Sequence, residues 1–382
     1  MSNLIKPAPD WDIFCKIVDN FGDIGVCWRL ASQLQREHGL SVRLWVDDLN
    51  AAKKIIPRLD VSLNQQVIDA ISIFKWPGFD KEGEADFADA ADVVIEAFAC
   101  ELPVTYLHAM AQKKSKWINL EYLSAESWVA DFHAKPSPQA NGLIRYFYFP
   151  GFSEATGGLI REAGIFNKNQ QLNDADDCQH VFWKSDDLTN SHHLKVSLFC
   201  YPHAPIESLL MAMADSNQQI SCYVPESSIL PKIAEFFGLS SMHIGENYQL
   251  KNLNLHVLPF LNQADYDQLL SACDINFVRG EDSWLRAIWA GKPFIWQPYF
   301  QDENTHIKKL AAFLALYYAD MDAKDVVLQM HNAWVAEQLS PKIWQSYLNQ
   351  LPDIAGYILQ QSQKLAQQTD LAAKLVIFCN KL

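Results

Sequence analysis

Short apolar runs that alternate with amphipathic stretches are the feature of this sequence that most restricts its fold. In the first half, the runs lie at residues 11–18, 41–46, 93–97 and 116–119. The stretch 25–36, which follows the first run, has the apolar spacing of a helix. This rhythm is typical of βαβ units around a parallel sheet. The first half therefore predicts a doubly wound α/β domain.

The second half repeats the rhythm, with apolar runs at 194–201, 220–224, 253–258, 275–278 and 293–296. Residues 167–187 are rich in Asn, Gln and Asp and lack an apolar period, which is typical of an exposed connection. We therefore expect domains at 1–180 and 181–361, with a C-terminal helix 362–382 packing back on the first domain. Two such domains facing each other predict a central cleft at the carboxyl ends of their strands.

The composition agrees with two domains and indicates where in the cell the protein is expected. The 382 residues are 49% apolar and 20% charged, enough to bury two large cores. Residues 1–10 lack the apolar segment of a signal peptide, and no apolar run approaches the roughly 20 residues that span a bilayer. We expect a cytoplasmic protein without a membrane partner.

Charge and cysteine spacing exclude two further classes. The 45 acidic and 31 basic residues give a net charge of −14, and no long basic cluster is present. Without such a cluster, nucleic acid is not an expected partner. The eight cysteines form no C-x-x-C pair, so we expect free thiols and no structural zinc.

An acidic loop, D-N-F-G-D-I-G-V at 19–26, follows the first predicted strand. Asp19 and Asp23 place two carboxylates in this loop, where they can hold a cation or accept a proton. The loop is not G-x-G-x-x-G, and its charge disfavours a phosphate, so we assign it to the acceptor. The alternative is structural: Asp23 caps the following helix and Asp19 forms an Asx turn.

A second βα loop, R-G-E-D-S, follows the predicted strand 275–278. The N-terminus of the next helix can receive a diphosphate, to which Arg279 adds charge and Ser283 a hydroxyl. This pattern indicates a nucleotide donor. The alternative is an ordinary helix cap beside a solvated arginine.

The segment 291–304, G-K-P-F-I-W-Q-P-Y-F-Q-D-E-N, is similar to the donor-site signature of GT-B glycosyltransferases, in which Gln301, Asp302 and Asn304 match the acidic-amide cluster. The alternative is a turn that caps a helix at 305–316.

Three aromatic residues and one glutamine near predicted strand ends form a candidate site for the pyrimidine base of a nucleotide. They are Phe199, Tyr201, Tyr266 and Gln263. Aromatic faces can hold a pyrimidine whose edge the amide reads. Core packing is the alternative for each ring.

Three long motifs together resemble one family over nearly the whole chain: D-N-F-G-D-I-G-V, R-G-E-D-S-W, and P-G-F-x-x-x-T-G-G-L at 150–159. They are similar to those of the elongation factor P arginine rhamnosyltransferases. The resemblance implies a GT-B fold, with an N-terminal acceptor-binding and a C-terminal nucleotide-sugar-binding Rossmann-like domain. It also implies inverting transfer of L-rhamnose from dTDP-β-L-rhamnose to one arginine of elongation factor P, which supports translation of polyproline stretches.

The same resemblance implies a role for each candidate residue. Asp23 is the general base, Asp19 orients the acceptor guanidinium, and Glu281 positions the reacting groups. Three residues hold the donor: Arg279, Asp282 and Ser283. Four lie near thymine and its sugar: Phe199, Tyr201, Gln263 and Tyr266. No cofactor and no metal are expected, because Arg279 and a helix N-terminus can stabilise the leaving diphosphate.

Two other functions fit parts of the pattern. One is a GT-B transferase or an epimerase that uses another nucleotide sugar, since donor motifs alone do not specify the reaction. The other is an inert binding protein on the same scaffold, which the three acidic candidates disfavour.

Overall fold

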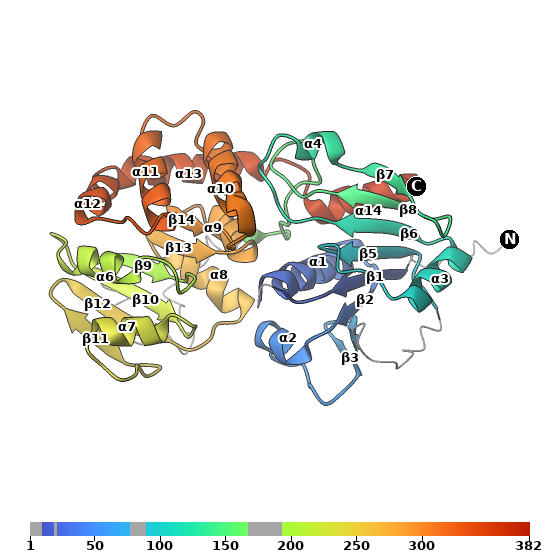
Figure 1. Cartoon of the computed structure of the whole chain (residues 1–382), viewed down its shortest axis with the longest axis horizontal. Helices are drawn as coiled ribbons and strands as arrows, with labels where there is room; N and C mark the ends of the chain where they lie inside the picture. The colour runs from blue at the N-terminus through green and yellow to red at the C-terminus, as the bar shows by residue number, and fades with distance from the viewer. Residues whose placement is uncertain (1–9, 19–20, 77–88, 167–192) are drawn as a thin grey trace. The chain divides into compact units, whose positions relative to one another are not determined.

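The computed structural model describes residues 10–18, 21–76, 89–166 and 193–382 (Figure 1). The chain divides into two compact units. The first comprises residues 1–163 and 368–382, and the second comprises residues 164–367. The break expected near residue 180 falls among residues outside those described.

The first unit is built on a sheet with strand order β3-β4-β2-β1-β5-β6-β8-β7. Its strands are β1 Asp10–Cys15, β2 Ser41–Val46, β3 Gln65–Ile68, β4 Ile71–Lys75, β5 Val93–Ala97, β6 Lys116–Leu120, β7 Lys135–Pro138 and β8 Ile144–Tyr148. Its helices are α1 Gly22–His38, α2 Leu49–Ile55, α3 Val104–Lys113, α4 Val129–Phe132 and α14 Leu371–Lys381. Only β3 and β7, the two edge strands, pair antiparallel within this described sheet.

The C-terminal segment belongs to the first unit, where α14 lies beside β6 and β8 (Figure 1). The predicted single helix 362–382 is wrong, because α13 ends at Leu365 and Asp370 starts α14 by accepting a hydrogen bond from the Ala373 N–H.

The T-G-G run at 156–158 explains how the C-terminal segment packs on the first unit. Gly158 has φ +77°, and a Cβ there would lie 2.7 Å from the Thr369 carbonyl oxygen. This motif is therefore needed for packing of the returning chain.

The second unit contains a sheet of order β11-β12-β10-β9-β13-β14, parallel except for β11. The strands are β9 Leu194–Leu198, β10 Ile220–Pro225, β11 Asn247–Leu250, β12 Leu253–Leu258, β13 Ile275–Arg279 and β14 Phe294–Gln297. The helices are α6 Ile206–Ala214, α7 Leu230–Phe236, α8 Gln263–Ala272, α9 Asp282–Ala290, α10 Thr305–Tyr317, α11 Lys324–Val335, α12 Pro341–Asn349 and α13 Leu351–Leu365, with a short 3-10 helix at Asp302–Asn304. The predicted α/β class is confirmed.

Stacked tryptophans hold one end of α9 against the second sheet. Trp284 of α9 stacks on Trp296 of β14 with ring centroids 3.7 Å apart, and Phe313 of α10 packs edge-on against both. The Trp296 indole N–H also donates to the Gly280 carbonyl oxygen at 2.7 Å. The loop between β13 and α9 is thus held at Gly280 by a hydrogen bond and at Trp284 by ring stacking.

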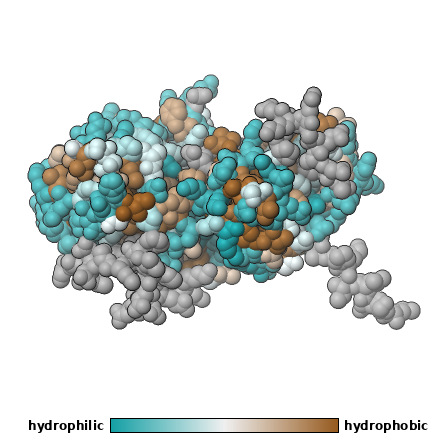
Figure 2. Space-filling model, turned by 90° about the horizontal axis from the view of Figure 1, so that it is seen from below, coloured by the Kyte–Doolittle hydropathy of each residue, from teal (hydrophilic) through white to brown (hydrophobic). Residues whose placement is uncertain are grey.

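The surface in Figure 2 is mostly hydrophilic on the face that it displays, and hydrophobic residues there form separated groups. Such scattered apolar residues are normal on a globular protein. Within the described ranges, no helix has both the length and the apolarity needed to cross a bilayer.

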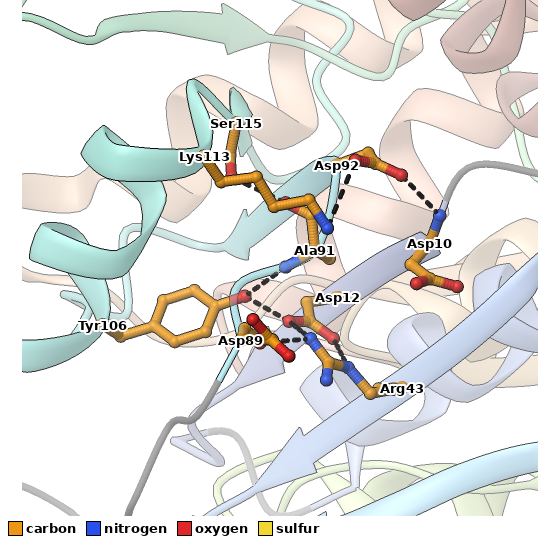
Figure 3. A network of polar contacts seen from close by, with 9 residues as sticks. All are labelled: Asp10, Asp12, Arg43, Asp89, Ala91, Asp92, Tyr106, Lys113 and Ser115. Carbon is orange, nitrogen blue, oxygen red and sulfur yellow. Dashed lines mark hydrogen bonds and ion pairs between the residues drawn. The ribbon is translucent and has the colours of Figure 1, made fainter.

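A polar network ties β1 to β2 and α3 (Figure 3). Asp12 of β1 is fully buried and accepts hydrogen bonds from Arg43 Nε and Nη2 at 2.5 and 2.6 Å. The Tyr106 hydroxyl donates to the same carboxylate. A buried carboxylate needs such partners, because leaving it unpaired costs several kcal/mol, on the order of 3–5. This network stabilises the fold.

Candidate active site

Both sheets have a switch point, where the strand order changes direction. In the first sheet it lies between β1 and β5, and in the second between β9 and β13. Loops that leave the carboxyl ends of such neighbouring strands run in opposite directions and leave a crevice in which doubly wound proteins bind ligands. The candidate residues follow β1 in the first unit and lie at or after the ends of β9 and β13 in the second, except for Gln263 and Tyr266, which lie on α8 after β12.

In the second unit, Arg279 joins the two loops of the switch point. Its guanidinium carbon lies 4.3 Å from the Phe199 ring centroid and 4.7 Å from that of Tyr201. Its Nη1 donates to the Cys200 carbonyl oxygen at 3.3 Å. Cation–π contacts with two rings restrict the guanidinium, so its position is set before a ligand binds.

The β13–α9 loop is shaped by Gly280 and Ser283. Gly280 has φ 61°, a conformation that glycine adopts at least cost. The Ser283 hydroxyl accepts a hydrogen bond from the Arg279 N–H at 3.1 Å and donates to the Arg279 carbonyl oxygen. The N-cap residue is Glu281, without a side-chain cap hydrogen bond. The interpretation of this loop as a simple Asp/Ser helix cap is therefore wrong.

The remaining predicted donor residues join the same cluster. Tyr266 packs edge-on against Phe199 with centroids 5.5 Å apart. Gln263 Nε2 donates to Asp282 Oδ2 at 3.2 Å. Burial raises the pKa of Tyr266, so its hydroxyl stays neutral. All seven predicted donor residues thus form one connected cluster, although the Gln263 amide contacts Asp282 in this structure.

Gln297 is a structural member of this cluster that the sequence reasoning did not single out. It lies at the end of β14, and only 1% of its surface is exposed. Its Oε1 accepts from the Tyr201 N–H at 2.8 Å, and its carbonyl oxygen accepts from the Gly280 N–H at 3.1 Å. Its only sequence signal was its place in the W-Q-P segment after the predicted strand.

In the first unit, α1 begins at Gly22, earlier than the predicted start near residue 25. Asp23 lies in its first turn, and the N-cap residue is Phe21. The buried Asp23 carboxylate accepts from the Val18 N–H at 2.7 Å and from the Tyr122 hydroxyl at 3.1 Å. The capping role considered for Asp23 is therefore wrong. Asp19 lies outside the described residues.

A pocket of about 240 Å³ opens at the switch point of this sheet. Its lining residues are Lys16, Val18, Phe98, Ala99, Cys100, Glu101 and Tyr122. Burial raises the pKa of the Cys100 thiol, and the Glu96 carboxylate adds to this effect. A thiol kept protonated is a poor nucleophile. Cys100 is therefore suited to shape the pocket rather than to attack a substrate.

Within the described residues, no group of three or more His, Cys, Asp or Glu side chains is arranged to hold a metal ion. The expectation of a metal-independent reaction stays a prediction.

Two α/β units, each built on a mostly parallel sheet with a switch point, are the architecture of the GT-B fold. The calicheamicin glycosyltransferase CalG4 shares this fold, with a TM-score of 0.52 at 12% identity over 98% of this chain and 99% of that one.

The chain belongs to the family of elongation factor P (EF-P) rhamnosyltransferases, EarP, whose model matches residues 11–380. A protein-arginine rhamnosyltransferase of Pseudomonas aeruginosa is 42% identical over 374 residues, covering 96% of this chain and 98% of the relative. The structure that describes EarP-mediated arginine glycosylation of translation elongation factor EF-P has a TM-score of 0.68 at 30% identity, over 98% of this chain and 99% of that one. The chain is thus an enzyme of the protein-arginine rhamnosyltransferase class.

Proposed function

We propose that this enzyme transfers L-rhamnose from dTDP-β-L-rhamnose to the side chain of one arginine of EF-P, with inversion at the anomeric carbon and without a metal ion. The observation that carries the proposal is the family match across residues 11–380. The geometry of each unit supports a separate part of the reaction.

The second unit is suited to bind the donor. Arg279, three residues before the start of α9, presents a planar guanidinium that two aromatic rings hold. A guanidinium fork and a helix N-terminus are both favourable partners for a diphosphate. They stabilise the charge that develops on dTDP as the bond between the anomeric carbon and the phosphate oxygen breaks. Phe199 and Tyr266 supply aromatic surface in the same cluster.

The first unit is suited to activate the acceptor. A guanidinium has a pKa above about 12 and delocalised nitrogen lone pairs, so it is a poor nucleophile. A fixed carboxylate can align one nitrogen and accept its proton as the new C–N bond forms. Asp23 is buried and held by two hydrogen bonds, which fixes its carboxylate. We assign the general-base role to Asp23.

Release of dTDP tests this proposal. The enzyme is incubated with dTDP-β-L-rhamnose, with or without EF-P, and free dTDP is measured over time. The proposal predicts release that requires EF-P and continues at the same rate after EDTA treatment. EF-P-independent release, or loss of the rate with EDTA that divalent cations restore, would contradict the acceptor or the metal-free mechanism, respectively.

Phe199→Ala should weaken dTDP binding, because the variant loses both an aromatic surface and the ring that restricts Arg279. Loss of base stacking on such a platform costs about 1–3 kcal/mol. Titration calorimetry with dTDP measures the change, and Phe199→Leu is the control that keeps apolar bulk without a π face. A folded Phe199→Ala variant with unchanged dTDP affinity would reassign Phe199 to core packing.

A further inference from the structure

Tyr122 contacts Asp23, the proposed general base, and also lines the pocket of the first unit. Its hydroxyl donates to Asp23 Oδ1 at 3.1 Å, and its ring lines the pocket. The ring stacks on Phe98, with centroids 4.2 Å apart and planes inclined by 11°. The stack limits rotation of the tyrosine ring and so fixes the direction of its hydroxyl.

The backbone that carries Phe98 is held in an unusual conformation. Phe98, Ala99 and Glu101 have φ values of 57°, 51° and 59°, in the left-handed region that disfavours residues with a Cβ. All of them line the pocket. Non-glycine residues in this region persist where the surroundings enforce them, and they gather at functional sites.

The surroundings that enforce this loop are visible. The Phe98 N–H donates to the Leu120 carbonyl oxygen at 2.7 Å, which joins the ends of β5 and β6. Glu96 is 1% exposed, and its Oε1 accepts from the Glu101 N–H at 3.0 Å. The other oxygen, Oε2, accepts from the Trp117 indole N–H at 2.9 Å and lies 3.5 Å from Arg145 Nη1. Hydrogen bonds from the Phe98 and Glu101 N–H groups thus hold the loop 98–101 at both ends.

We infer that Tyr122 is a positioning residue for Asp23, and that the loop 98–101 exists to hold Tyr122 in place. The inference rests on the proposed function, in which Asp23 is the base. The hydroxyl fixes one carboxylate oxygen while the Val18 N–H fixes the other. Both oxygens are therefore oriented before the acceptor arrives, and fixed orientation of a catalytic group accelerates a reaction.

Tyr122→Phe tests the inference, since it removes the hydroxyl and keeps the ring stack. We expect kcat for EF-P modification to fall about tenfold, in line with loss of a hydrogen bond to a charged group, while KM for either substrate changes little. The same substitution in an Asp23→Asn background should have no further effect on kcat, because the two residues act as one unit. Phe98→Leu should give a smaller loss of kcat.

Tyr106→Phe is the matched control, because it removes another hydrogen bond from a tyrosine hydroxyl to an aspartate in the same unit (Figure 3). It should lower the melting temperature and leave kcat unchanged. A folded Tyr122→Phe enzyme with wild-type kcat would overturn the inference. An equal loss of kcat on adding Tyr122→Phe to the wild-type and to the Asp23→Asn enzyme would also overturn the inference, since Tyr122 would then act independently of Asp23.

Assays of the wild-type enzyme distinguish a failure of the inference about Tyr122 from a failure of the proposed function. If the wild type does not release dTDP in response to EF-P, the proposed function itself is wrong, and the inference falls with it. If the wild type does so and Tyr122→Phe is as fast, only the positioning role is wrong.

Discussion

Asp23→Asn should lower kcat by about 100-fold or more while leaving dTDP binding intact. The amide has the size of the carboxylate, and its one oxygen can accept from the Val18 N–H while its NH2 group donates to the Tyr122 hydroxyl oxygen. It has no capacity to accept the proton of the reacting guanidinium or to pair with its charge. Single-turnover assays at saturating donor measure the chemical step, and dTDP titration measures binding.

Asp19→Asn is the comparison for this result. If Asp19 orients the acceptor, its defect should be partly relieved by saturating EF-P, whereas the Asp23 defect should persist in kcat. Near-normal transfer by folded Asp23→Asn would show that its carboxylate only holds the Val18 N–H and the Tyr122 hydroxyl.

Arg279→Ala should weaken dTDP binding roughly 10- to 100-fold and slow turnover as well. The guanidinium is the cationic group that two aromatic rings hold at the switch point of the second sheet. A hydrogen bond to a charged group contributes about 1.5–3 kcal/mol, and a bidentate clamp on phosphate lies at the upper end. Calorimetry with dTDP and steady-state kinetics give both quantities.

Arg279→Lys is the matched variant, because it keeps the charge without the planar fork. It should recover only part of the affinity. If Arg279→Ala binds dTDP normally and transfers at the wild-type rate, the donor loop has been wrongly assigned.

The central strands of both sheets were predictable because buried parallel strands give continuous apolar runs. The runs at 41–46, 93–97 and 253–258 coincide with β2, β5 and β12. The antiparallel edge strands β3, β7 and β11 gave no such signal. β7, with the sequence K-P-S-P, contains two prolines, which only an edge strand tolerates well.

Two helix boundaries differ from those that the apolar pattern predicted. The predicted helix began at residue 25, but α1 begins at Gly22, and the Gly25 N–H donates to the Phe21 carbonyl oxygen. Asp370 splits the predicted C-terminal helix by starting α14. Apolar spacing reports which face of a helix is buried and does not by itself mark the residues at which the helix begins and ends.

The donor cluster could be anticipated because its members follow strands that the doubly wound topology places side by side. The contact of Tyr122 with Asp23 could not, since it spans 99 positions and depends on how the β5–α3 loop is fastened. Likewise, the sequence predicted a diphosphate-binding role for Arg279 without indicating that Phe199 and Tyr201 hold its guanidinium.

The intact mass of EF-P after incubation with this enzyme and dTDP-β-L-rhamnose, with fragmentation to locate the added group, tests whether the enzyme rhamnosylates an arginine of EF-P. We expect a gain of one deoxyhexose, located on a single arginine and absent with the Asp23→Asn enzyme at the same time point. An unmodified EF-P, or a sugar on any residue other than arginine, would contradict it.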